Sequence, residues 1–111
     1  MTQAVDLQTF NDLKELMDDA MDEFIQTYLE NTPLLIQRIE AGLNASDAEA
    51  VFHSAHQLKG GSGSLGATQL AQLAFQIEQL GKSGTTAGVE PLLQSLKSEF
   101  TAVEAFLAEQ S

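Results

Sequence analysis

The chain of 111 residues has no cysteine and no tryptophan, and aromatic residues make up only 6% of it. The absence of cysteine excludes disulfides, thiolate chemistry and cysteine-based zinc sites. Basic residues are scarce, because five lysines and arginines stand against 16 acidic residues and leave a formal net charge of -11. This charge argues against nucleic acid and against an anionic membrane surface as partners. Since the sequence has no run of about 18 apolar residues, we expect no membrane-spanning helix.

What is present fits one folded domain. Hydrophobic residues make up 43% of the chain, enough for a core, and the length corresponds to a single domain over residues 1–111. Residues 1–12 lack the basic start and apolar run of a signal peptide, so we expect a cytoplasmic protein. Strand signals are few and helical periodicity predominates, which predicts an all-α fold.

Apolar residues at helical spacing predict five helices joined by mostly short connections. Four of them are long enough to pack as an antiparallel four-helix bundle, with a short additional helix at the N-terminus. Pro33 interrupts the second helix and predicts either a kink or the first turn of a separate short helix. The clearest loop is the segment 81–88, which is rich in Gly, Ser and Thr. The expected helices span residues 6–18, 21–42, 47–64, 68–80 and 89–109.

The third predicted helix carries a histidine on a strip that lacks bulky side chains. Lys59, Gly60 and Gly63 follow His56 at three, four and seven residues, so the four positions share one helix face. His56 lies at the flank of the apolar face, where one ring nitrogen keeps access to water, whereas His53 lies nearly opposite the core. Such a strip suits the close approach of another protein's backbone to the imidazole.

The glycines of this strip have two interpretations. Gly60, Gly61 and Gly63 each cost about 1 kcal/mol relative to alanine in a helix interior. The helix could end near Gly60, with the glycines forming a flexible turn. Alternatively the helix continues, because the apolar spacing persists to Leu65, and side-chain bulk is excluded so that a partner can approach. We expect the second arrangement, with Gly60 and Gly63 providing clearance for docking.

Lys59 also has two interpretations. It could be an ordinary solvated lysine, or its ammonium could neutralise an incoming phosphoryl group beside the imidazole. Lys59 is one of only five cations in a strongly acidic chain, and it follows His56 by one helical turn. This placement favours the functional interpretation.

Residues 47–81 resemble the central hairpin of a histidine-containing phosphotransfer (HPt) domain. The resemblance rests on the run His56-Gln57-Leu58-Lys59-Gly60, on the small residues that follow it, and on Leu65-Gly66-Ala67 with Leu70 opening the next helix. The HPt fold is a four-helix bundle with a short leading helix, and it agrees with the predicted helices over nearly the whole chain. The resemblance implies a phosphorelay intermediate of two-component signalling.

In such a relay, His56 would accept a phosphoryl group from an aspartyl phosphate and pass it to another aspartate. The donors and acceptors would be receiver domains of response regulators or hybrid sensor kinases. A neutral imidazole attacks an acyl phosphate readily, and catalysis needs mostly positioning and charge neutralisation. The receiver would bring the aspartate, the Mg²⁺ and its own lysine, so we expect no metal or nucleotide on this chain. We expect a monomer without autonomous kinase activity, because the chain has no room for an ATP-binding domain.

HPt domains often place a side-chain amide on the following helix to orient the imidazole. The matching position here is Glu78, with Gln76 and Gln79 nearby. Our hypothesis is that Glu78 accepts a hydrogen bond from one ring N–H of His56 and leaves the other nitrogen free to attack. The alternative is that Glu78 is a solvated surface residue.

Docking is expected to use apolar residues exposed near His56 on the first two helices. The candidates are Leu13, Met17 and Met21, each of which could instead belong to the core. The alternative function is a non-catalytic helical adaptor that binds receiver or kinase domains without transferring phosphate.

Three other patterns indicate different chemistry and are weaker. Residues 61–66 spell G-x-G-x-x-G, but the dinucleotide motif needs a preceding strand, and here a helix precedes it. Glu49, His53 and His56 could share a helix side and bind a metal, although a fourth ligand is missing. A small acidic helical protein could also be an acyl carrier modified at Ser64, but in that family an aspartate usually precedes the serine, and here Gly63 does.

Overall fold

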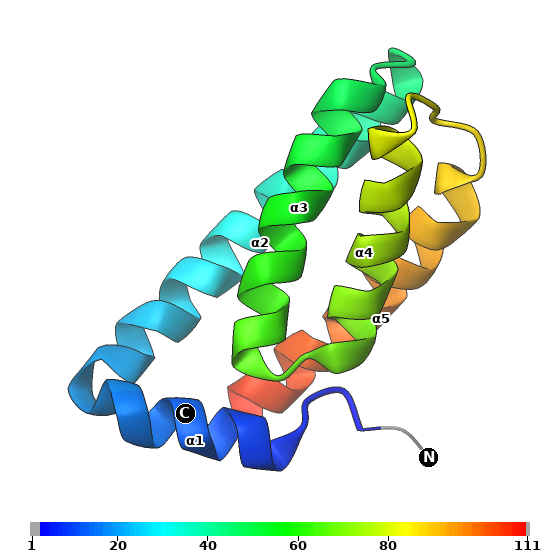
Figure 1. The fold of residues 1–111 in the computed structure, drawn as a ribbon. Coiled ribbons are helices and arrows are strands. Elements are labelled where there is room, and N and C mark those ends of the chain that lie inside the picture. The colour runs from blue at the N-terminus through cyan, green and yellow to red at the C-terminus, as the bar shows by residue number, and fades with distance from the viewer. Residues whose placement is uncertain (1–2, 111) are drawn as a thin grey trace.

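The computed structural model describes residues 3–110, and its longer helices run antiparallel to one another along the chain in an elongated bundle (Figure 1). The described chain is helical apart from its turns, and no described helix is long and apolar enough to cross a membrane. The elements are α1 (Leu7–Met17), the 3-10 turn η1 (Asp18–Ala20), α2 (Met21–Asn44), α3 (Ala48–Leu65), α4 (Thr68–Lys82) and α5 (Val89–Glu109). The predicted all-α four-helix bundle with a short leading helix is confirmed.

Helices α2 to α5 form the bundle, and α1 lies across the end where α3 turns into α4 (Figure 1). Two contacts hold α1 there. The backbone N–H of Asp6 donates to the carbonyl of Gly66 at 2.7 Å, and the Phe10 ring meets the Phe106 ring of α5 edge-on, with centroids 5.2 Å apart. The leading helix therefore closes one end of the core.

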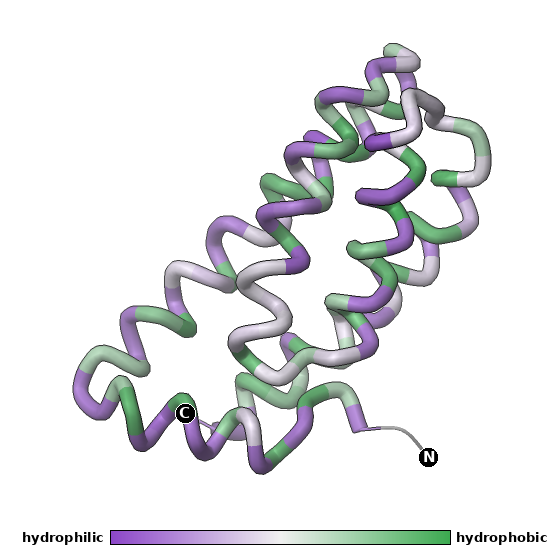
Figure 2. Tube along the Cα trace, in the orientation of Figure 1, coloured by the Kyte–Doolittle hydropathy of each residue, from purple (hydrophilic) through white to green (hydrophobic). Residues whose placement is uncertain are grey.

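The core is mainly aliphatic, in keeping with the low aromatic content, although Phe10, Tyr28 and Phe100 are also buried in it. Apolar and polar residues alternate with helical period along each helix, so every bundle helix has one side to bury (Figure 2). Burying these sides against one another removes apolar surface from water, which is the main stabilising term for such a bundle. The large side chains exposed by 1% or less include Ile39, Leu58, Leu65, Leu70, Ile77, Leu93 and Leu96.

Helix α3 runs unbroken through its glycines. The Asp47 side chain caps its start by accepting from the Ala50 N–H at 3.1 Å, and Gly66 ends it in the left-handed region with φ of 95°. The alternative in which the helix ends near Gly60 is therefore wrong. The predicted continuation is confirmed, because the buried apolar residues anchor both ends of the helix.

Two sequence-based boundaries need correction. Helix α2 is continuous through Pro33, so the predicted alternative of a separate short helix is wrong. Proline removes only one backbone hydrogen bond, and the buried Leu35, Ile36 and Ile39 keep the following turns packed on the bundle.

The loop expected over residues 81–88 begins later than predicted, because Gly81 and Lys82 complete α4. A Cβ on Gly81 would lie 2.8 Å from the carbonyl oxygen of Ala48 and 2.8 Å from the amide nitrogen of Phe52. Gly81 therefore acts as a packing residue that lets α4 approach the backbone of α3 closely.

Candidate functional site

His56 projects from the exposed side of α3, with 60% of its side chain accessible to solvent. Its Nδ1 lies 2.6 Å from Oε2 of Glu78 on α4. The contact predicted between these two side chains is therefore present. Helix periodicity puts His56 at the flank of α3, and the close packing of α4 brings the carboxylate to it.

Glu78 is buried, with only 5% of the residue exposed, so its interpretation as a solvated surface glutamate is wrong. Its Oε1 lies 2.7 Å from Nζ of Lys59. Among the described residues no hydrogen bond of standard geometry reaches Oε1, so the Lys59 ammonium compensates this oxygen as an ion pair. His56, Lys59 and Glu78 thus form one cluster, which we call the His–Lys–Glu triad.

The charge on Glu78 determines how His56 is oriented. Burial acts to raise the pKa of Glu78, but the Lys59 ammonium and the His56 ring, both in contact with the carboxylate, outweigh burial and lower this pKa below its ordinary value of 4.5. An ionised carboxylate only accepts hydrogen bonds, so Nδ1 of His56 is the donor. In the neutral ring, the lone pair then belongs to Nε2, which is the nitrogen available for attack.

Two aromatic rings that the sequence pattern did not link to the site flank the triad. Phe52 stacks on the His56 imidazole, with centroids 6.0 Å apart and an interplanar angle of 24°. Nζ of Lys59 lies 5.4 Å from the centroid of Phe75, a cation–π contact, and Phe75 is 40% exposed. The four-residue spacing of Phe52 and His56 was the signal that could have paired them.

The glycines divide into two kinds. A Cβ placed on Gly60 or Gly63 would meet nothing within 4 Å, whereas one on Gly61 would contact the Tyr28 ring at 3.5 Å. Gly61 therefore faces α2, while Gly60 and Gly63 lie on open surface on either side of His56. Gly60 and Gly63 therefore leave open space beside the imidazole, as the sequence predicts.

The expected docking residues are not equally available. Met21 is only 4% exposed and belongs to the core, so its assignment to the docking surface is wrong. It opens α2 directly after the 3-10 turn and packs within the hydrophobic core. Leu13 and Met17 are partly buried against the core, so they offer a partner only part of their surface.

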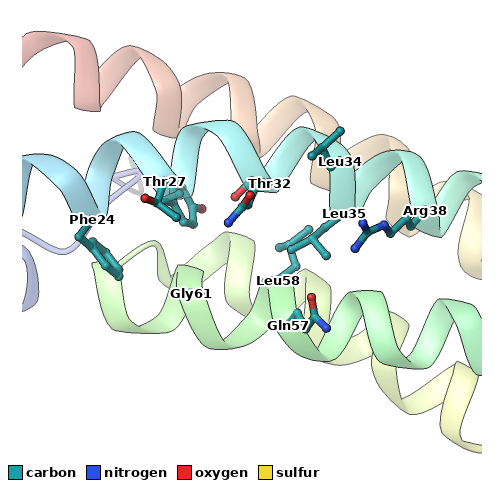
Figure 3. Close-up of a pocket in the computed structure, with 11 residues that line it drawn as sticks. Phe24, Thr27, Thr32, Leu34, Leu35, Arg38, Gln57, Leu58 and Gly61 are labelled. Carbon is teal, nitrogen blue, oxygen red and sulfur yellow. The ribbon is translucent and has the colours of Figure 1, made fainter.

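A groove of about 370 Å³ lies between α2 and α3 beside the histidine strip (Figure 3). Its α3 side includes Gln57, which follows His56 directly. Beneath it, the Tyr28 hydroxyl and the buried Ser62 hydroxyl are hydrogen bonded at 2.8 Å. Leu34, at 47% exposure, leaves apolar surface at its rim. The groove is lined by Phe24, Thr27, Tyr28, Asn31, Thr32, Leu34, Leu35, Arg38, Gln57, Leu58 and Gly61.

The rival patterns do not form sites. Glu49 and His53 make an exposed pair at 3.7 Å, while His56 turns to Glu78, and the described residues contain no cluster of three or more metal-ligating side chains. Residues 61–66 form the last turns of α3 and its cap, not a loop after a strand, so the dinucleotide interpretation is wrong.

Comparison with known proteins assigns the family. A family model described as the Hpt domain matches residues 23–106, which include the whole triad. The chain belongs to the Hpt domain family. Histidine-containing phosphotransfer protein 2 of Arabidopsis thaliana is 30% identical over 105 residues, which cover 88% of this chain and 67% of the plant protein. This Hpt domain is thus a phosphorelay intermediate of two-component signalling, as the sequence predicts.

Solved structures agree with this assignment. The crystal structure of HptB, a histidine-containing phosphotransfer protein from Pseudomonas aeruginosa PAO1, matches with a TM-score of 0.93 at 26% identity, over 99% of this chain and 96% of that chain. Ypd1 of Saccharomyces cerevisiae, crystallised with the receiver domain of its downstream response regulator Ssk1, matches with a TM-score of 0.85. At 14% identity over 99% of this Hpt domain and 95% of Ypd1, the second likeness concerns the fold.

Proposed function

We propose that His56 carries the phosphoryl group, accepting it from an aspartyl phosphate on one receiver domain and passing it to the aspartate of another. One observation carries this proposal: His56 is 60% exposed while its Nδ1 is held at 2.6 Å by the buried Glu78. The ring is thereby fixed in one orientation and tautomer, with Nε2 as the nucleophile. His53 on the same helix is similarly exposed, at 63%, but its carboxylate partner is the exposed Glu49, and its ring contacts Phe52.

Phosphoryl transfer to His56 requires no proton to leave the imidazole ring. The Nε2 lone pair attacks phosphorus, the bond between phosphorus and the aspartyl oxygen breaks, and the aspartate departs as a carboxylate. The ring retains its Nδ1 proton and becomes a phosphorylated imidazolium facing the Glu78 carboxylate. In the reverse step, a receiver aspartate attacks phosphorus and the ring returns to its neutral form.

Lys59 supports the phosphoryl group in this proposal. Its ammonium is held beside the site by Glu78 and by the face of Phe75. Charge neutralisation and positioning are what phosphoryl transfer requires most. Gly60 and Gly63 leave open surface over which the receiver's backbone approaches Nε2.

We further propose that receiver domains dock along α3 and over the groove between α2 and α3. Gln57 and Gly61 line the groove, and each directly follows a residue of the histidine strip. One partner can therefore cover the groove and His56 together. Ypd1, which shares this fold, was crystallised with a receiver domain, and this supports the partner class. Leu13 and Met17 remain candidates for contact at the edge.

Several sequence-based expectations remain proposals. The Mg²⁺ of the reaction is assigned to the receiver, and no metal or nucleotide is assigned to this chain. A monomer in the cytoplasm that acts as an intermediate without kinase activity of its own is consistent with the proposed role. Sedimentation analysis and incubation with ATP alone would test the oligomeric state and the lack of kinase activity.

The proposal is tested by phosphorylating the protein and locating the phosphoryl group. The protein would be incubated with several phosphorylated receiver domains, and separately with phosphoramidate as a small-molecule donor. Intact mass would then be measured at neutral pH and after acid. We expect one acid-labile phosphoryl group on the wild type and on His53→Gln, and none from receivers on His56→Gln.

His53→Gln is the matched control, because it removes the other exposed imidazole of α3. Labelling of His56→Gln by a receiver would place the phosphoryl group elsewhere and refute the assignment. A folded wild type that binds receivers but is labelled by none of them would support the adaptor function instead.

A further inference from the structure

We propose that the negative charge of Glu78 keeps Nδ1 of phosphorylated His56 protonated, so that the ring leaves as a neutral imidazole when phosphate is passed on. This inference rests on the proposed role of His56 and concerns the outgoing half of the relay. It assigns Glu78 as a positioning residue whose charge, beyond its hydrogen bond, sets the reactivity of the phosphohistidine.

The contacts single out the carboxylate. Glu78 Oε2 lies 2.6 Å from Nδ1, the ring nitrogen that does not carry the phosphoryl group, and the residue is 5% exposed. A buried charge at hydrogen-bond distance interacts far more strongly than a solvated one, because water screens it little. A neutral amide in this place could orient the ring, but it could not stabilise a cation to the same extent.

The chemistry requires the Nδ1 proton. When a receiver aspartate attacks phosphorus, the bond between phosphorus and Nε2 breaks and its electron pair returns to Nε2. With Nδ1 protonated, the departing ring is neutral and no proton has to move. Without that proton the ring would depart as an imidazolate anion, which is a much poorer leaving group.

The charges of the other groups around the ring also affect protonation of Nδ1. Lys59 on α3 forms an ion pair with the second oxygen of Glu78 at 2.7 Å, and its positive charge opposes a cationic ring. Phe52 and Phe75 are uncharged, and the exposed Glu49 pairs with His53 farther along α3. Glu78 and Lys59 therefore shift the protonation of the phosphorylated ring in opposite senses.

The test is a pH titration of the phosphorylated ring by phosphorus NMR. All variants would carry His53→Gln, which leaves His56 as the sole histidine of a chain that has two. Each would be phosphorylated with phosphoramidate. We expect Glu78→Gln to lower the pH midpoint of Nδ1 deprotonation by about 1 to 2 units, as expected for loss of an opposite charge at contact distance.

Two further variants test whether the midpoint responds to the sign of the removed charge and to its distance from the ring. Lys59→Gln should raise the midpoint, and this arm holds even if Glu78→Gln folds poorly. Glu49→Gln removes the same charge from an 84% exposed side chain on α3 and should leave the midpoint nearly unchanged. Transfer to a receiver should fall as the pH rises through each variant's own midpoint.

The outcomes separate this inference from the proposed function. If phosphoramidate and receivers fail to label His56, the proposed function itself fails. If His56 is labelled but Glu78→Gln titrates at the wild-type midpoint, the hydrogen bond serves orientation only and this inference is overturned. A downward shift in Glu49→Gln as large as that in Glu78→Gln would also overturn it, because net charge would then explain the effect.

Discussion

Replacing Gly60 by alanine should make the protein more stable, and replacing it by a larger residue should make it a poorer partner for receiver domains. A Cβ at this position meets nothing within 4 Å, so the folded state accepts a side chain without strain. Alanine restores helix propensity worth about 1 kcal/mol at an interior position. For a domain of this length that corresponds to a rise in Tm of about 4 °C.

The cost should appear only when a receiver docks. Glutamine at Gly60 keeps most of the helix propensity but adds a long side chain one turn from His56. A side chain forced into a close-packed contact costs roughly 1 to 3 kcal/mol, so transfer from a receiver should slow by about 5-fold to 100-fold. Phosphorylation by phosphoramidate, which needs no docking, should keep its wild-type rate.

Thermal unfolding, receiver transfer rates and phosphoramidate labelling rates would be measured for Gly60→Ala and Gly60→Gln. Gly81→Ala is the matched control, because its Cβ would lie 2.8 Å from the backbone of α3 and should lower Tm. If Gly60→Gln gains stability and transfers as fast as the wild type, clearance is not the reason for glycine. If receiver transfer and phosphoramidate labelling slow by the same factor, the substitution acts on the triad and not on docking.

The groove and the buried tyrosine give two further predictions. Leu34→Asp should weaken receiver binding by roughly 10-fold, as for an apolar contact inside an interface. Leu7→Asp on α1 should not weaken binding, although the two leucines are similarly exposed, at 47% and 45%. Calorimetry with a receiver domain would measure both affinities, and equal losses would contradict docking at the groove. Burial raises the pKa of Tyr28 to about 12 against the opposing hydrogen bond of Ser62. The stability this residue contributes is therefore complete below its ordinary value of 10.0 and is lost as the pH rises through about 12. Ultraviolet titration of the only tyrosine in the chain reports this directly, and ionisation near 10 in the folded protein would refute the buried geometry.

Local pattern was sufficient for the helices and for the histidine strip. The spacing of apolar residues predicted the last helix at Val89–Glu109 with the bounds it has, and it predicted that the third helix continues past three glycines to residue 64, one residue short of its end at Leu65. These properties follow from the geometry of a single helix, in which residues three and four apart share a face. The same geometry placed His56 at the edge of the core before any neighbour was known.

Other features depend on which helix covers which face. Met21 and Leu13 have similar sequence contexts, yet one is buried and the other only partly so, because burial is decided by the neighbouring elements. Pro33 weakens one turn locally, but packing on both sides keeps α2 whole. Packing between helices also brings the Phe75 ring to Lys59, and it leaves the Phe52 ring stacked on His56.

The sequence by itself determined the helical fold, the exposed imidazole and its open surroundings, because each follows from periodicity and residue size along one helix. Tertiary structure decided the electrostatics of the site. The approach of Glu78 to His56 could be predicted. Its burial, and the pairing of one oxygen with His56 and the other with Lys59, depend on how closely α4 packs on α3. Charge is felt through distance and solvent exposure, and neither is encoded in the spacing of residues along the chain.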